Sequence, residues 1–369
     1  MAATKRRGPA AVVAGVTLAA GAAHAVDLPE DRAEVMYHLY DGGGTRASGP
    51  AVLVRKSMLD RVSVSGIYYV DAVSNASIDV VTTASPYKET RNEFDLGVDY
   101  VVRDTLIHVA GSRSKEPDYI ADTASVDLTQ DVFGGMTTVA IGFTKGNDKV
   151  GQKGTPGWID SAHHWQYRLG LTQILTPRWL ATANLEAISD DGYLGSPYRV
   201  ARVFGATVPE RDPRTRESKA LKLGFVGDIT PEGGERRSSV RAEYRYFWDT
   251  WNIKASTLEV GYSRYLAPGW LADGFVRYYK QTHALFYSDD AQAETLYVTR
   301  NKQLSNFHDI SVGGKLTYTL KSVPGKYDVH LTGAYQLLSF HYKDYTDIRT
   351  GSPYSFNAHV LQAYVSATF

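Results

Sequence analysis

Apolar and polar residues alternate along most of the chain, in segments of about ten residues. Within residues 92–102, for example, Phe94 and Leu96 share one face while Glu93 and Asp95 share the other. Successive side chains of a β-strand point to opposite faces of its sheet, so a period of two residues predicts strands. Because helical spacing is hard to find, the chain is expected to fold almost entirely as β-structure.

The alternating segments number about sixteen. The two weakest lie near residues 50–57 and 104–112, where both faces are mixed. If these two are not strands, about fourteen remain. A closed antiparallel sheet with both chain ends at one rim needs an even number of strands, and both counts satisfy that requirement.

The connections between these segments alternate between short turns and long loops. Short turns lie near residues 59–60, 103–104, 133–135, 176–177, 230–234, 268–269 and 323–325. Long loops lie near residues 72–90, 145–161, 190–216, 283–305 and 342–355, with shorter members at 41–49, 113–121 and 249–252. Short turns at one rim and long loops at the other are typical of an up-and-down transmembrane barrel.

Tryptophans lie near both expected rims. Trp179 and Trp270 follow short turns, whereas Trp248 and Trp251 flank a connection of the other class. Because Trp and Tyr favour the membrane–water interface, two aromatic girdles are expected.

The first 25 residues have the layout of a secretory signal peptide. Basic residues at 5–7 precede an apolar run at 10–23, and Ala23-His24-Ala25 offers a small-residue cleavage site. The apolar run is shorter than the roughly 20 residues that a spanning helix needs. Residues 1–25 are therefore expected to be removed on export, and residues 26–369 to form the barrel.

Composition excludes several classes of protein. The chain has no Cys, which excludes a disulfide scaffold, a thiolate metal site and a cysteine nucleophile. Its 40 basic and 40 acidic residues cancel, so no basic field indicates a nucleic-acid partner. A mean hydropathy of −0.28 is compatible with a membrane barrel, because barrel strands show lipid only alternate side chains.

These patterns predict an all-β fold, a transmembrane up-and-down antiparallel β-barrel of about 16 strands, with 14 as the alternative. Unpaired backbone groups are costly in hydrocarbon, so the first segment, 32–40, is expected to pair with the last, 356–369. That last segment ends on Phe369. A terminal aromatic resembles the signature recognised by the barrel assembly machinery of Gram-negative bacteria, which becomes an expected partner together with the surrounding outer-membrane lipid.

Three stretches carry a family resemblance. RAEVMYHLYDGGG at 32–44, GPAVLVRKS at 49–57 and SIDVVTTASPYKE at 77–89 resemble a bacterial family of predicted outer-membrane β-barrels of unknown function. The resemblance extends over most of the chain after the signal peptide, and its most specific stretch is 77–89. Genes of that family often lie near those for a flavin-attaching transferase and a thioredoxin-like periplasmic protein. The resemblance therefore implies a periplasmic redox partner, but it transfers no catalytic motif.

Charged and polar side chains on the face opposite the apolar one are expected to line the lumen. This set consists of Arg32, Glu34, His38, Glu93, Asp95, Asp99, Arg168, Lys222, Arg241, Glu243, Arg245, Glu259, Asp273, Arg277, Asp309 and Lys315. Such a set is compatible with facing rows of opposite charge that create a transverse field in a pore. It is equally compatible with ion pairs that cross and block the lumen.

The sequence offers no site that would indicate an enzyme, a metal or a cofactor. His163 and His164 are adjacent, and neighbours on a strand point to opposite faces, so the two do not easily share a metal. The sequence contains no G-x-S-x-G or H-E-x-x-H motif. Gly42-Gly43-Gly44 precedes no helix that could hold a phosphate.

Two loops are candidates for interaction. The loop 71–91 contains an apolar run at 78–81 and is expected to fold into the barrel mouth or to meet a partner, with Asp71, Asp79, Tyr87 and Lys88 as the candidate residues. The loop 196–216 is rich in arginine, which is compatible either with contact to lipopolysaccharide phosphate or with a solvated loop.

The resulting prediction is an exported, integral outer-membrane barrel of a Gram-negative bacterium that acts as a pore, transport or scaffold component, linked through the resemblance to envelope redox chemistry. Two alternatives from other classes are an outer-membrane hydrolase barrel and a secreted soluble β protein that binds glycans.

Overall fold

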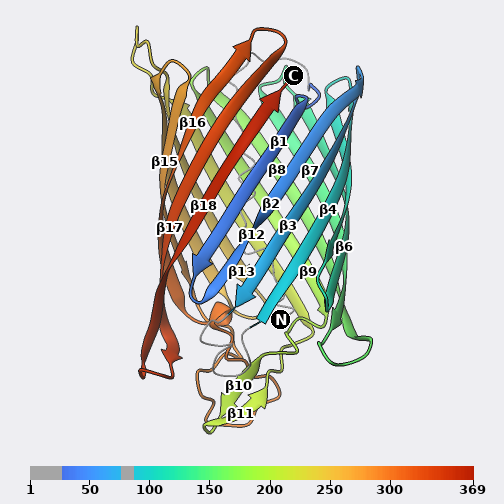
Figure 1. Ribbon diagram of the computed structural model, residues 1–369, viewed down its shortest axis with the longest axis vertical. Coiled ribbons are helices and arrows are strands. Elements are labelled where there is room, and N and C mark those ends of the chain that lie inside the picture. Colours follow the sequence, from blue (N-terminus) through green and yellow to red (C-terminus); the bar gives the residue numbers. More distant parts are fainter. Residues whose placement is uncertain (1–26, 76–86) are drawn as a thin grey trace.

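The computed structural model describes residues 27–75 and 87–369 (Figure 1). The predicted signal peptide lies outside these residues. Within them the chain is almost entirely β-structure, and the one helical element is a single 3-10 turn, η1 (Lys302–Leu304). No helix in this part of the chain is long and apolar enough to cross a membrane.

Sixteen strands, each antiparallel to its neighbours, close into a barrel (Figure 1). They are β1 (Arg32–Gly42), β2 (Thr45–Leu59), β3 (Val62–Asn75), β4 (Tyr87–Val102), β5 (Thr105–Lys115), β6 (Tyr119–Val132), β7 (Thr137–Gly151), β8 (Trp158–Thr176), β9 (Trp179–Gly192), β12 (Thr215–Asp228), β13 (Ser238–Asp249), β14 (Lys254–Ala267), β15 (Trp270–Gln281), β16 (Phe307–Val323), β17 (Tyr327–Asp347) and β18 (Ser352–Thr368). A separate hairpin, β10 (Val200–Val203) and β11 (Ala206–Pro209), projects from the loop rim.

The barrel closes between its first and last strands. The β1–β18 ladder runs from Arg32 opposite Thr368 to Gly42 opposite Ala358. Beyond it, the backbone N–H of Phe369 donates to the carbonyl of Asp31 at 3.0 Å. The predicted closure of the first segment on the last is therefore confirmed.

The alternative of fourteen strands is wrong, because the two segments with weak alternation form β2 and β5. Both pair along their length with neighbours on each side. Their inner faces carry apolar residues such as Leu53 and Leu106 beside polar ones, which blurs the alternation in sequence. Because their backbone groups are paired on both sides, these segments form strands whether their inner side chains are apolar or polar.

The outer wall is an exposed apolar band. On β4, Phe94, Leu96 and Val98 point outward and are exposed. Asp99 on the same strand points inward and is 2% exposed. Large apolar side chains exposed in this pattern around a closed sheet are what a barrel presents to lipid.

The tryptophans agree only in part with the predicted girdles. Trp179 and Trp270 lie on the outer face beside the short turns, and Trp248 lies on the outer face near the loop rim. Trp251 is not a girdle residue, because its side chain is 5% exposed and its Nε1 donates to the carbonyl of Thr215 at 2.9 Å. Its apolar ring is covered by the loops, which the sequence pattern did not reveal.

Several predicted loops are shorter than expected, because the strands continue beyond the apolar band. β7 and β8 leave only residues 152–157 between them, and β17 and β18 leave only 348–351. In these extensions the outer face is polar, as at His163 and Asn147, which bond to each other at 2.9 Å. Water can solvate that face, so the sequence there no longer alternates between apolar and polar residues. The strands nevertheless remain paired.

The lipid-facing assignment is testable with two neighbouring positions on β18. Leu361 faces outward and is 46% exposed, whereas Gln362 faces inward. We expect Leu361→Arg to reduce the free energy of unfolding by about 2–4 kcal/mol, because it places a cation among lipid tails. Gln362→Arg, the control, should cost much less. Urea unfolding in lipid vesicles measures both, and an equal loss for the two variants contradicts the assignment.

Candidate functional site: the barrel lumen and its mouth

The side chains predicted to line the lumen all lie on strands, on the face opposite the exposed apolar band. Their ion pairs among the described residues run along the wall, within one strand or between neighbouring and next-neighbouring strands. These pairs therefore differ from both arrangements considered from the sequence, which were facing rows of opposite charge and ion pairs across the lumen.

The largest inner network joins β13, β14 and β15. Arg241 contacts Asp273 at 2.8 Å and Glu259 at 3.6 Å, and Arg277 contacts Glu259 at 2.8 Å. On the adjoining strands, Lys222 pairs with Glu243 at 2.7 Å.

Two further inner pairs recruit carboxylates that sequence analysis missed. Arg245 pairs with Glu186 at 3.2 Å, and Arg168 pairs with Asp127 at 2.6 Å. Glu186 and Asp127 have the inward parity of their strands, so strict parity counting could have found them.

Glycines on the middle strand allow a guanidinium to reach over it. Asp127, Gly142 and Arg168 are aligned in register across β6, β7 and β8. A Cβ at Gly142 would overlap Oδ1 of Asp127 and lie 2.7 Å from Nε of Arg168. Gly261 on β14 has the same role under Arg241, where a Cβ would lie 2.7 Å from Nε. These arginines therefore lie flat along the wall.

Asp71 was predicted in a loop, and that placement is wrong. It lies on β3 and is 5% exposed, with one oxygen 2.6 Å from Nε2 of His38 and the other 2.7 Å from Arg91. His38 also stacks on Tyr69 and shares a 2.9 Å hydrogen bond with its hydroxyl. β3 runs further into the loop region than its polar sequence suggested, so Asp71 belongs to the wall.

The other three candidates from that loop have different outcomes. Tyr87 and Lys88 were predicted in a loop, but they are the first two residues of β4, whose backbone pairs with Asn75 and Ser74. Asp79 lies outside the described residues. The expectation that the apolar run 78–81 folds into the mouth falls outside them as well.

His108 and Asp99 form an imidazole–carboxylate pair on the inner wall, with Nδ1 and Oδ1 2.7 Å apart. In a hydroxyl-nucleophile hydrolase such a pair orients the other ring nitrogen toward the nucleophile. Among residues 27–75 and 87–369, no group forms a hydrogen bond with Nε2 of His108. Asp99 is instead approached by Arg55 at 3.8 Å, as in the other wall pairs.

The remaining predicted lumen residues lie outside the larger networks described above. Glu34 forms an ion pair with Arg32 on the same strand, and Asp309 accepts a 3.2 Å hydrogen bond from Ser311. Lys315 forms no ion pair with any described residue. Glu93 and Asp95 share the inward face of β4 with Asp99.

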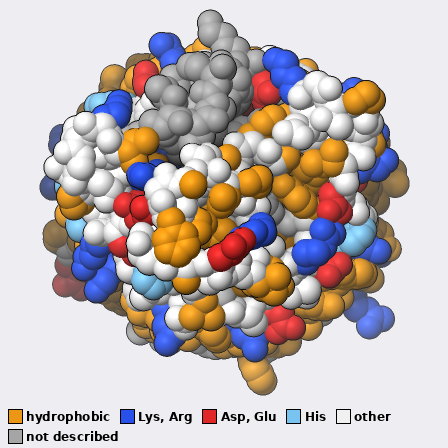
Figure 2. Space-filling model, turned by 90° about the horizontal axis from the view of Figure 1, so that it is seen from below, with side chains coloured by type: hydrophobic (Ala, Val, Ile, Leu, Met, Phe, Trp, Pro, Cys, Tyr) orange, Lys and Arg blue, Asp and Glu red, His pale blue; other side chains and the backbone are white. Residues whose placement is uncertain are grey.

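An apolar core that sequence analysis missed covers part of the mouth. Its buried members extend from Ala162 on β8 to Tyr354 on β18, half of the barrel circumference away. The rest of this mouth core consists of Leu194, Trp251, Ile253, Ala284, Tyr287, Leu304, Tyr342 and Tyr345. Figure 2 shows loop side chains covering much of this end of the molecule.

The segment between β15 and β16 is anchored in that core by an arginine. Arg300 donates to the carbonyl of Thr346 at 2.6 Å, pairs with Asp289 at 2.7 Å and lies 4.4 Å from the ring centre of Tyr345. The sequence pattern predicted a long loop here but gave no sign of its packing, because the partners come from distant strands.

The arginine-rich loop is partly neutralised within the protein. Arg214 pairs with Asp160 through two contacts of 2.7 and 3.0 Å, and Arg216 pairs with the buried Asp249 at 2.6 Å. These two guanidinium groups are engaged with protein carboxylates, which weakens the predicted contact of this loop with lipopolysaccharide.

Beyond the apolar band, His164 joins three strands. Its Nε2 lies 2.9 Å from Asp148 on β7, and its Nδ1 lies 2.9 Å from Asp190 on β9. Burial lowers the pKa of His164, but the hydrogen bonds and charges of the two carboxylates outweigh it and raise the pKa to about 9. At neutral pH a single imidazolium therefore lies between these two buried acids.

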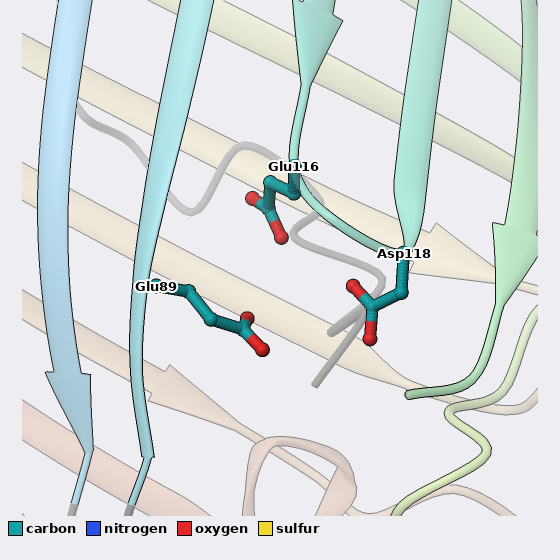
Figure 3. Close-up of side chains that lie close together, drawn as sticks. All are labelled: Glu89, Glu116 and Asp118. Atoms are coloured by element: carbon teal, nitrogen blue, oxygen red, sulfur yellow. The ribbon is translucent and has the colours of Figure 1, made fainter. Parts of the chain in front are cut away.

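Three carboxylates gather at another corner of the mouth (Figure 3). Oxygens of Glu89, Glu116 and Asp118, one from each residue, lie within 4.8 Å of one another. The Tyr198 hydroxyl donates to Asp118, which connects this corner to the segment after β9. Glu116 and Asp118 lie in the same connection between β5 and β6, and the fold brings Glu89 of β4 to them.

A family model described as "Protein of unknown function (DUF3570)" matches residues 19–163 and 158–331. The chain belongs to this family. Its match covers most of the barrel and confirms the resemblance expected from the sequence. No curated protein matches the chain.

Solved structures similar to this DUF3570 protein are outer-membrane β-barrels. A bacterial polysaccharide outer membrane secretin has a TM-score of 0.52 at 8% identity, with 93% of this chain and 100% of that chain covered. A loop-deletion mutant of OmpT, an outer membrane protein of Vibrio cholerae, has a TM-score of 0.45 at 11% identity, with 91% and 97% covered. Pseudomonas aeruginosa OpdK with vanillate has 0.44 at 10%, with 92% and 98% covered. At these identities the likeness shows the fold alone.

The role of His164 predicts a pH-dependent stability. Its folded pKa of about 9 lies above the ordinary 6.5, so its contribution is complete below about pH 6.5 and is lost as the pH rises through about 9. We expect His164→Gln to cost about 2–3 kcal/mol at pH 6.5 and to remove this pH dependence. Unfolding in vesicles at several pH values measures it. The control is His163→Gln on the outer face, and an identical pH profile in both variants contradicts the role.

The wall-pair geometry predicts an unequal response of two glycines to alanine. Gly142→Ala should destabilise the barrel by about 1–3 kcal/mol, because the new methyl group overlaps the Asp127–Arg168 pair. At Gly333 a Cβ meets nothing within 4 Å, so Gly333→Ala is the control and should be nearly neutral. Equal urea midpoints for the two variants contradict a role for Gly142 in the pair.

Proposed function

We propose that this DUF3570 protein is exported through its N-terminal signal, resides in the outer membrane of a Gram-negative bacterium and forms a passage for small polar solutes. The observation that carries the proposal is the inner wall, whose charges pair along the wall and whose arginines lie flat over glycines. Barrels of this size leave a lumen that side chains do not fill.

Lateral pairing has a consequence for selectivity. A pore lined by one sign of charge, or by opposed rows, imposes a strong field on a passing ion. Here Arg168 is compensated by Asp127, and Arg241 by Asp273. The proposed passage therefore favours polar solutes with little discrimination by charge.

The mouth core supports a restricted entrance. Its members come from the segments after β9, β13 and β15 and from β17 and β18. Trp251 packs against Phe286 with ring centres 4.9 Å apart, and the Tyr287 hydroxyl donates to the carbonyl of Asp344 on β17 at 2.8 Å. An entrance narrowed in this way selects solutes by size. If the loops close the lumen completely, the same barrel acts as a scaffold, which is the second role that we consider.

Two expected partners stay predictions. The periplasmic redox partner rests on the family resemblance, and recognition by the assembly machinery rests on Phe369, which is exposed at the end of the chain with Nζ of Lys56 4.8 Å from its ring centre. Crosslinking from the periplasmic turns in cells tests the first, and removal of Phe369 with measurement of the assembled fraction tests the second.

Planar-bilayer conductance tests the passage. We expect discrete steps with weak ion selectivity, and we expect Arg168→Gln to shift the selectivity toward cations because it leaves Asp127 uncompensated. Arg113→Gln is the matched control, since Arg113 pairs with Asp122 on the exposed outer face. A folded barrel that inserts but gives no steps overturns the passage and favours the scaffold.

A further inference from the structure

A row of basic side chains lies on the outer wall near the loop rim, just beyond the apolar band. The row crosses six neighbouring strands, β12 to β17, and consists of Lys219, Lys254, Lys280, His308, His341 and Lys343. All except the half-buried His308 are exposed. On each strand the parity that leads to these residues is that of the lipid-facing side chains.

Strand register aligns the basic row. Lys280 on β15 is opposite His308 on β16, which is opposite His341 on β17. On the other side, Lys219 and Lys254 are both opposite Trp248 of β13. Strands lie about 4.8 Å apart, so the whole row spans roughly 24 Å of the barrel surface.

The lysines of the basic row have no counter-ion among the described residues: none of them forms an ion pair with any residue of 27–75 or 87–369. Two acidic residues lie beside the row in the chain, Glu217 near Lys219 and Asp344 next to Lys343. Asp344 is engaged elsewhere, because it contacts His283 at 2.8 Å and accepts hydrogen bonds from Asn306. Desolvation lowers the pKa of His308 from its ordinary value, and the nearby positive charges of His341, Lys343 and Lys280 lower it further. Gathering these charges is therefore unfavourable for the protein alone.

Apolar side chains lie on the membrane side of the basic row, at the next outward position on β15 and β16 and one position further on β17. Tyr278 on β15, Ile310 on β16 and Leu337 on β17 are exposed on the same outer face. His308 and His341 stack with ring centres 5.1 Å apart, and Tyr278 approaches His308 at 6.1 Å. A ligand bound here meets cations at one end and a broad apolar surface at the other.

We propose that the basic row binds the phosphorylated headgroup of a membrane lipid, with the acyl chains of that lipid on the apolar band. The proposal rests on the membrane location proposed above. A phosphate just above acyl chains is complementary to both halves of the surface. A free phosphate would use the cations alone, and the continuity of row and band favours the lipid. This surface is distinct from the arginine-rich loop 196–216.

Native mass spectrometry of the protein without its signal peptide tests the proposal. The protein is released from zwitterionic detergent micelles containing either diphosphoryl lipid A or the same lipid without its phosphates. We expect retention of the phosphorylated lipid only. Each lysine near an anionic surface contributes about fivefold in affinity, so Lys280→Gln combined with Lys343→Gln should weaken retention by at least about tenfold.

The matched control removes two exposed lysines from the opposite part of the outer wall. Lys115→Gln combined with Lys149→Gln deletes the same charge, but there Asp122 is close enough for Lys149 to lower its pKa. The control should retain lipid A as the unchanged protein does. Equal losses in both double variants, or equal retention of the two lipids, overturn the proposal.

Two further outcomes distinguish a failure of the lipid site from a failure of the proposed membrane location. If inorganic phosphate competes with lipid A at equal concentration, the row is a site for free anions and the lipid assignment is wrong. Heat-modifiable migration of each sample shows whether the barrel is folded in micelles. A protein that never folds there overturns the membrane location and the lipid site together, whereas a folded barrel without phosphate preference overturns the lipid site alone.

Discussion

Backbone hydrogen bonding in a medium without water is the constraint on which the rest of this structure depends. Every strand must have a partner on both sides, so the sheet has to close, and β1 pairs with β18 along its full length. Because the sheet is closed, each strand has one face toward lipid and the other toward the lumen, and side chains alternate between the two. β2 and β5 are strands despite their mixed faces because the ladder needs them.

The closed sheet also determines how the inner charges are neutralised. Neighbouring strands bring acids and bases within a few ångströms along the wall, much closer than the far side of the lumen. Where the partner is two strands away, a glycine such as Gly142 or Gly261 allows the guanidinium to lie across the middle strand. Because these charges are compensated along the wall, the pairs need no partner across the lumen, which is the physical basis of the proposed passage.

The outer surface consists of two zones. Its apolar band matches acyl chains, while the strand ends beyond it carry polar groups that water can solvate. Within that polar zone, β12 to β17 present the basic row, whose lysines have no ion-pair partner among the described residues. On the inner face of the wall, His164 of β8 lies between Asp148 of β7 and Asp190 of β9. The basic row is therefore the part of the rim proposed to receive an anionic partner.

The sequence by itself determined the fold class, the closure and the face of each lumen residue, because a period of two and the need for paired backbone follow from local chemistry. It did not determine partners. Asp71 was placed in a loop, and the Arg168–Asp127 pair and the mouth core from Ala162 to Tyr354 were missed, since each depends on strands far apart in the chain. Register decides which side chains meet, and register is a property of the assembled barrel.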